Sequence, residues 1–191
     1  MISGCASLIV RWLIKSKVIA DEEKELYHYA AYSFLLTIAP LLMTILFGCL
    51  LGELKNSIIL IVPFMLIRKF SGGYHARRSW TCILLSSVLL CMCIYASSKI
   101  NYNFYFAIIT LIATIGLALF SPIDSENRRL DAIERKFYKK ATIYISEFFW
   151  ILSIGFCLLN LEIVSTCISI GIILSFGLQL PCIFRRNGRC N

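Results

Sequence analysis

The sequence has little charge and almost no histidine. Only 16% of its 191 residues are charged and two are histidine, whereas 59% are hydrophobic and the mean hydropathy is +0.78. A soluble domain contains about 45 to 50% apolar residues, so this composition excludes an ordinary soluble protein. Six membrane spans of about 20 residues each would use most of the chain. We therefore predict an all-α integral membrane protein, with residues 1–191 forming a single membrane-embedded domain.

Several catalytic and metal-binding signatures are also missing. The chain contains no His-Glu-x-x-His, Gly-x-Ser-x-Gly or Cys-x-x-Cys sequence, which argues against a zinc peptidase, a nucleophile-elbow serine hydrolase and a cysteine metal site. His28 and His75 are its only imidazoles. No cleavable signal peptide is expected either, because Arg11 interrupts the first apolar stretch. We expect no bound metal and no cofactor.

Nine cysteines are present, but their positions do not suggest a disulfide framework. Most lie within apolar runs, where a cysteine behaves as a small apolar residue. The cysteines assigned to this role are Cys49, Cys91, Cys93, Cys157, Cys167 and Cys182.

Six apolar runs predict a transmembrane bundle over residues 32–184, at about 32–51, 57–67, 79–98, 101–121, 141–160 and 163–184. The segments before, between and after them contain 4, 1, 4, 1, 6, 0 and 3 lysines and arginines. The positive-inside rule therefore places both termini, the tail 185–191 and the loops near residues 75 and 130 in the cytoplasm. We expect these charges to attract anionic lipid or an acidic peptide, and not nucleic acid.

Residues 1–30 are predicted to form an interfacial helix and an acidic linker. Cys5, Leu8, Ile9 and Trp12 recur at helical spacing over residues 2–19, and basic residues are interspersed among them, as in helices that lie on a membrane surface. The acidic cluster of residues 21–25 is typical of a solvated helix start.

The second apolar run leaves two alternatives open. Its uncharged part, residues 56–67, is 12 residues long, about 18 Å as a helix against a hydrocarbon core of about 30 Å. It is either a short helix from whose end Arg68 and Lys69 reach the interface, or a re-entrant element that turns near Pro63. The alternation of charge favours a true crossing.

A histidine and a thiol occur together in the charged segment that follows. His75 and Cys82 are seven residues apart, about 10.5 Å along a continuous helix, which is too far for proton transfer. The Gly72-Gly73 pair allows the backbone to fold back and bring His75 over the start of the third apolar helix. Cys82 would lie one turn inside that helix, where the helix terminus, Arg77 and Arg78 favour the thiolate.

A cysteine and a histidine are the smallest set of catalytic groups that covalent acyl transfer needs. The thiolate attacks a carbonyl and the imidazole transfers protons. With two histidines and nine cysteines, however, a spacing of seven also arises by chance. The alternative is an interfacial histidine beside a packed cysteine.

Two motifs resemble the AgrB family, bacterial membrane endopeptidases that process quorum-sensing propeptides of the AgrD type. The first is Arg68-Lys-x-x-Gly72-Gly73-x-His75-x6-Cys82, which resembles the family's active-site segment. The second, within residues 121–130, is similar to the family's Pro-x-Asp-x-x-Asn loop and includes Asp124 and Asn127. Chain length, six apolar runs and a basic cytoplasmic face also fit, so the resemblance covers essentially the whole chain.

The resemblance implies that His75 and Cys82 are the catalytic pair. It implies cleavage of a propeptide before its acidic C-terminal tail through a Cys82 acyl-enzyme, followed by closure of a thiolactone or lactone ring. It further implies a homodimer in the bacterial cell membrane. The propeptide's amphipathic leader would lie on the inner leaflet, and its acidic tail would meet Arg77, Arg78 or the basic run of residues 128–140.

The positions expected to bind substrate or shape the site are Arg68, Gly72, Gly73, Arg77, Arg78, Asp124 and Asn127. Arg68 either holds a substrate carboxylate or carbonyl, or anchors the helix at the membrane surface. Gly73 is expected to serve backbone shape. Asp124 and Asn127 either cap their loop or orient His75. The competing function is a non-enzymatic membrane scaffold or small peptide exporter, in which the Gly72-Gly73 segment is a gate.

Overall fold

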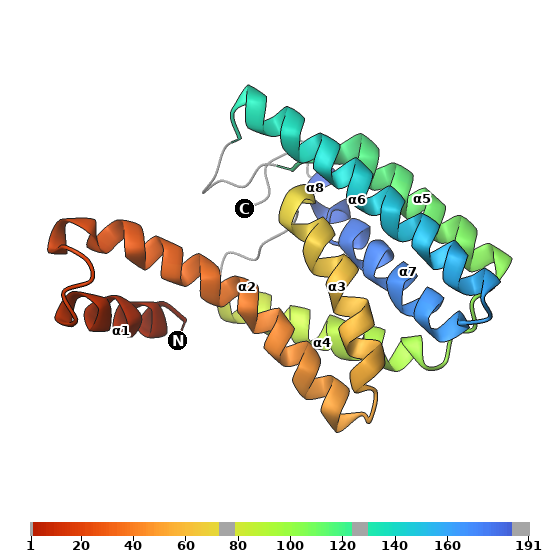
Figure 1. Ribbon diagram of the computed structural model, residues 1–191, viewed down its shortest axis with the longest axis horizontal. Coiled ribbons are helices and arrows are strands. Elements are labelled where there is room, and N and C mark those ends of the chain that lie inside the picture. Colours follow the sequence, from red (N-terminus) through yellow and green to blue (C-terminus); the bar gives the residue numbers. More distant parts are fainter. Residues whose placement is uncertain (1, 73–78, 124–129, 185–191) are drawn as a thin grey trace.

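The computed structural model describes residues 2–72, 79–123 and 130–184, with the backbone alone at residues 2, 3, 33, 36, 37 and 79–84. All regular elements in these ranges are helices (Figure 1), which confirms the predicted all-α class. Their bounds, in chain order, are α1 Ile2–Lys15, η1 Asp21–Glu23, α2 Lys24–Leu50, α3 Leu54–Ser71, α4 Ser79–Ser97, α5 Phe104–Phe120, α6 Ala132–Leu158, α7 Glu162–Gly177 and α8 Leu180–Phe184.

The helix α1 forms a hairpin with the first half of α2 and lies apart from the other helices (Figure 1). Ala6 and Val10 are buried, whereas Leu8 and Trp12 are each 65% exposed. The predicted N-terminal helix is therefore present, and the Leu8 and Trp12 side chains are free to contact lipid. The acidic cluster starts the next helix, as expected, but α2 begins at Lys24, so the linker is shorter than the predicted boundary at residue 30.

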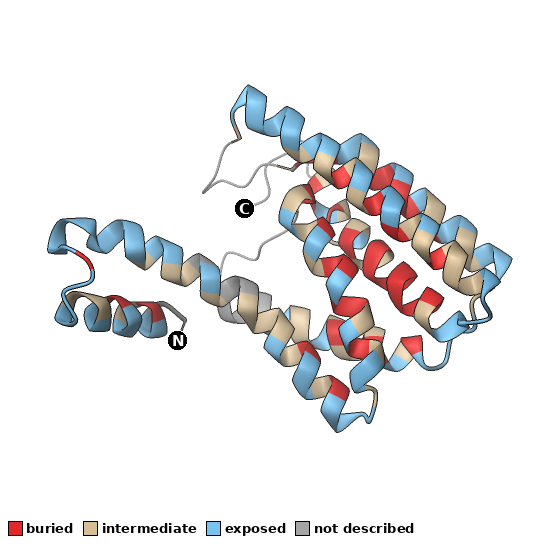
Figure 2. Ribbon diagram, viewed as in Figure 1, coloured by how far each residue is buried: buried red, intermediate tan, exposed pale blue. Residues whose placement is uncertain are grey.

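The core is centred on α7, which packs against α3, α5 and α6. Figure 2 shows the buried residues concentrated on α7 and on the helix faces turned toward it. The approach of α3 is close because Gly171 has no side chain: a Cβ atom there would lie 2.8 Å from the Leu60 carbonyl oxygen. Small residues commonly allow such close helix contacts in membrane proteins.

The structure decides between the two alternatives that the sequence left open for the second apolar run. It is a continuous helix, α3, that passes through Pro63, so the re-entrant turn near Pro63 is wrong. The helix is longer than the uncharged run, because the charged residues at both ends of that run are also helical. These residues are Lys55, Arg68 and Lys69. Its 18 residues span about 27 Å.

Two helical stretches are long and apolar enough to cross a membrane, Ala132–Leu158 and Glu162–Phe184. Three shorter apolar segments accompany them within the described residues, at Ile38–Leu50, Leu85–Ser97 and Phe104–Phe120. One face of α5 exposes Ile108, Ile112, Ile115 and Leu119, a pattern suited to contact with lipid. The six crossings and the sidedness of the loops remain predictions.

Candidate functional site

The loops that contain the two sequence motifs begin side by side, although the motifs lie about 50 residues apart. Ser71 is the last residue of α3, and Ile123 follows the end of α5. The backbone N–H of Ile123 donates to the Ser71 carbonyl over 3.0 Å, and Gly72 pairs with Ile123 in an isolated parallel β-bridge. We call the contact among Ser71, Gly72 and Ile123 the loop junction.

Gly72 is suited to the loop junction because it has no side chain. Its φ of 68° and ψ of −158° fall in a backbone region that is essentially restricted to glycine. A Cβ atom at this position would also collide with the Ile123 carbonyl oxygen. The prediction that the glycine pair allows unusual backbone geometry is therefore confirmed at Gly72.

Arg68 contacts the loop junction with its side chain. Its Nη1 donates to the carbonyl oxygen of Gly72 over 2.6 Å, and hydrogen bonds from a charged donor are stronger than neutral ones. The sequence suggested either substrate binding or an anchor at the membrane surface for this residue. The structure adds a contact that neither alternative included, between the guanidinium and the start of its own loop.

Gln179 also binds the loop junction, and sequence reasoning missed it. It lies between α7 and α8 and is fully buried. Its Nε2 donates to the Ser71 carbonyl over 3.0 Å and to Ser121 Oγ over 2.8 Å. The only signal in the sequence is an amide within the apolar run 163–184.

Cys82 lies in α4, of which the structure describes Ser79–Ser97. Its distance from the start of the helix remains a prediction, because the residues just before Ser79 lie outside the described ranges. The other predicted positions that follow Gly72 in the two motifs lie outside the described residues, and their pairing with Cys82 remains a prediction. These residues are Gly73, His75, Arg77, Arg78, Asp124 and Asn127.

A basic surface adjoins the end of α3. The Phe70 ring packs edge-on against the rings of Phe137 and Tyr138, with centroids 6.4 and 5.6 Å away. This contact fixes the first turns of α6 beside the segment that leads into the loop junction. Four basic residues of these turns are exposed and form what we call the α6 basic surface: Arg135, Lys136, Lys139 and Lys140.

One cysteine differs from the prediction. Cys182 is disulfide-bonded, whereas Cys49, Cys91, Cys93, Cys157 and Cys167 are free, as predicted. The prediction failed because it considered only hydropathy. Cys182 is at the end of its apolar run, in the short helix α8.

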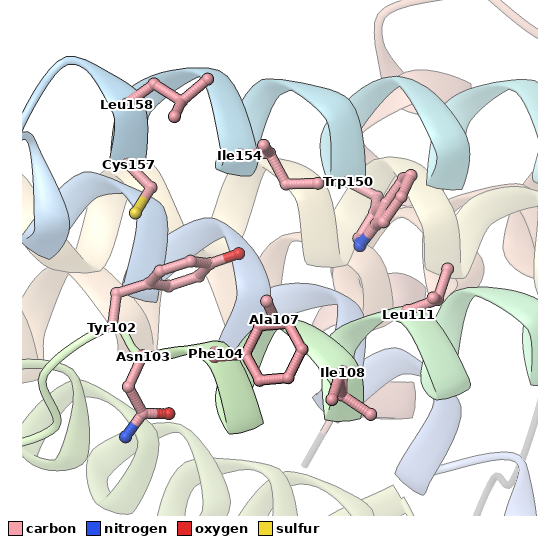
Figure 3. Close-up of a pocket in the computed structure, with 10 residues that line it drawn as sticks. All are labelled: Tyr102, Asn103, Phe104, Ala107, Ile108, Leu111, Trp150, Ile154, Cys157 and Leu158. Atoms are coloured by element: carbon pink, nitrogen blue, oxygen red, sulfur yellow. The ribbon is translucent and has the colours of Figure 1, made fainter.

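A separate cavity of about 470 Å³ lies between α5 and α6 (Figure 3). Tyr102 and Trp150 extend into it, and their buried Oη and Nε1 atoms have no hydrogen-bond partner. It is at the ends of α5 and α6 opposite to the loop junction, since Tyr102 precedes α5 and Leu158 ends α6. The described residues that line it are uncharged.

The chain matches the family described as Accessory gene regulator B over residues 6–181. It is 24% identical over 144 residues to a "Putative AgrB-like protein" of Clostridium perfringens, covering 71% of this chain and 67% of the relative. A "Putative AgrB-like protein" of Clostridium acetobutylicum is 24% identical over 156 residues, or 81% and 73% of the two chains.

"Protein FsrB" of Enterococcus faecalis is 26% identical over 87 residues, which is 43% of this chain and 36% of the relative. No solved structure gives a significant match. The family match and the two long apolar helices together indicate a membrane protein. Because the match extends over most of the sequence, the chain belongs to the accessory gene regulator B family.

Proposed function

We propose that this chain is a membrane cysteine endopeptidase that removes the C-terminal tail of an AgrD-type propeptide. Membership of the family supports this role, since both motifs resemble the family's functional segments. The observation that carries the proposal is the loop junction. It places the beginnings of the loops that contain His75 and Asp124 side by side, as a shared site requires, and Cys82 lies in the helix α4 that follows the first of these loops in the chain.

The first step of the proposed reaction forms a thioester. The Cys82 thiolate attacks the carbonyl before the propeptide tail, the C–N bond breaks, and the tail leaves as an amine that takes a proton from His75. Arg77 and Arg78 precede Cys82 in the sequence, and nearby positive charge favours its thiolate.

The second step returns the acyl group to the peptide. His75 removes the proton from a side-chain thiol or hydroxyl of the bound peptide, and that atom attacks the thioester carbonyl. The bond to Cys82 breaks, which regenerates the thiolate and closes a thiolactone or lactone ring. A thioester retains much of the acyl-transfer potential, so exchange with a peptide thiol is nearly balanced and consumes no other reactant.

Mass spectrometry of the chain incubated with its propeptide tests this route. We expect an adduct on Cys82 with the mass of the N-terminal propeptide fragment, sensitive to neutral hydroxylamine, and release of the tail peptide. Tail release without such an adduct at early times would contradict the covalent route. No tail release would instead favour the scaffold or exporter alternative.

The α6 basic surface is proposed to bind the acidic tail of the propeptide. Changing Lys136, Lys139 and Lys140 together to glutamate is expected to raise KM by about threefold to a hundredfold, because each exposed ion pair contributes about 0.2 to 1 kcal/mol. The effect should shrink in high salt, which screens exposed charges. Rates of cleavage measured over a range of peptide and salt concentrations give both quantities.

The matched control reverses two lysines at the other end of the helices. Lys55 follows the start of α3 and Lys99 follows the end of α4, so Lys55→Glu with Lys99→Glu should leave KM nearly unchanged. An unchanged KM in the α6 triple variant at low salt would show that the tail binds elsewhere.

A further inference from the structure

Three segments that are distant in sequence meet at one carbonyl oxygen. The Ser71 carbonyl, at the end of α3, accepts from the Ile123 N–H and from Gln179 Nε2, both over 3.0 Å. The same Nε2 donates to Ser121 Oγ over 2.8 Å. All of these side chains are buried: Ser71 and Gln179 are 0% exposed and Ser121 is 5% exposed.

The chemistry of the partners fixes the orientation of the Gln179 amide. The Ser71 carbonyl can only accept a hydrogen bond, so the amide nitrogen must face it. A buried carbonyl at a helix end needs a partner because no intrahelical N–H is available to it. Gln179 thus provides a donor from α7 to the ends of both α3 and α5.

The other atom of the amide indicates that the residue does not serve stability alone. Gln179 Oε1 is buried and has no hydrogen-bond partner within the described part of the chain, which costs free energy. An apolar side chain of similar size avoids that cost, although it also removes the donor to the Ser71 carbonyl and to Ser121 Oγ. What such a side chain cannot do is join Ser71 to Ser121.

We infer that Gln179 is a positioning residue for the proposed cleavage, which holds together Ser71 and Ser121, the residues at which the two motif loops begin. The inference rests on the proposed function. Gln179 touches neither substrate nor Cys82 in this role, and it acts through Ser71 and Ser121. Small misplacements of reacting groups by distant residues can lower rates by about 10²-fold.

Gln179→Leu is therefore expected to lower kcat for propeptide cleavage by about 10- to 100-fold and to change KM by less than about threefold. It should also speed exchange of the Ile123 amide hydrogen, because the loop junction loses the side chain that links Ser71 to Ser121. Hydrogen–deuterium exchange of peptides covering residues 117–123 measures this opening without reference to activity.

Two further variants test whether the effect comes from the link between Ser71 and Ser121. Ser121→Ala removes only one partner of the amide and should give a smaller loss of kcat, and combining it with Gln179→Leu should add nothing further. Ser175→Ala is the control: Ser175 is also fully buried on α7, but its Oγ donates to Gly171 of its own helix over 2.8 Å. It should leave kcat and Ile123 exchange unchanged.

The two measurements separate this inference from the proposed function. Faster Ile123 exchange together with a lower kcat in Gln179→Leu and Ser121→Ala supports the positioning role. Wild-type exchange in both variants, or a change in KM alone, overturns it even if Cys82 proves essential. Failure of the proposed function is recognised separately, by cleavage that persists when Cys82 is replaced.

Discussion

Cys82→Ala is expected to lower propeptide cleavage by about 10⁴- to 10⁶-fold, the loss typical of removing an enzyme nucleophile. The substitution deletes one sulfur atom from the helix α4, so we expect normal insertion into the membrane. Quantifying the released tail by mass spectrometry, at equal amounts of membrane-inserted protein, measures the loss.

The matched control is Cys91→Ala, which changes a half-buried, free cysteine of the same helix. It should cleave at a rate close to that of the unaltered chain. A Cys82→Ala protein that still releases the tail would rule out the covalent route. Equal losses in both variants would point to disturbance of α4 and not to loss of a nucleophile.

Gly72→Ala is expected to have the second largest effect, a loss of about 10²-fold or more in kcat. A side chain at φ 68°, ψ −158° costs about 1 to 3 kcal/mol in backbone strain, and its Cβ would overlap the Ile123 carbonyl. The loop junction must therefore open, which separates the two motif loops. Cleavage kinetics and Ile123 hydrogen exchange should change together.

Gly52→Ala separates the two causes of this effect. Gly52 also has a positive φ, of 70°, but no atom lies within 4 Å of a Cβ built there. It should show a modest loss of thermal stability from strain, with nearly normal kcat. If Gly72→Ala behaves like Gly52→Ala, the close approach to Ile123 does not control the site.

Hydropathy predicted where apolar helices lie but not where they begin. Predicted runs starting at residues 32 and 141 correspond to α2 and α6, which begin at Lys24 and Ala132. Their first turns are polar, so an apolar run cannot include them. At α6, Asp131 and Glu134 form a capping box that starts the helix, a local signal that hydropathy ignores. These extra turns matter because they carry the α6 basic surface.

The candidate site was predictable where it depended on local sequence. The unusual backbone conformation of Gly72 followed from the conformational freedom of glycine. The loop junction did not, since the contact of Ser71 with Ile123 depends on how α3 and α5 pack on α7. The role of Gln179 could not be predicted for the same reason, since its partners are 108 and 58 residues away in the sequence. A single amide in an apolar run also forms no periodic pattern.

The hydrogen bond from Gln179 to Ser71 also bears on the order in which the chain is made. Synthesis proceeds from the N-terminus, so α3, α4 and α5 emerge well before α7. The ends of α3 and α5 then lack their shared donor until residue 179 has been added and α7 has packed between them. A partly synthesised chain thus already contains Cys82, but the helix ends from which the motif loops begin do not yet have the hydrogen bonds from Gln179.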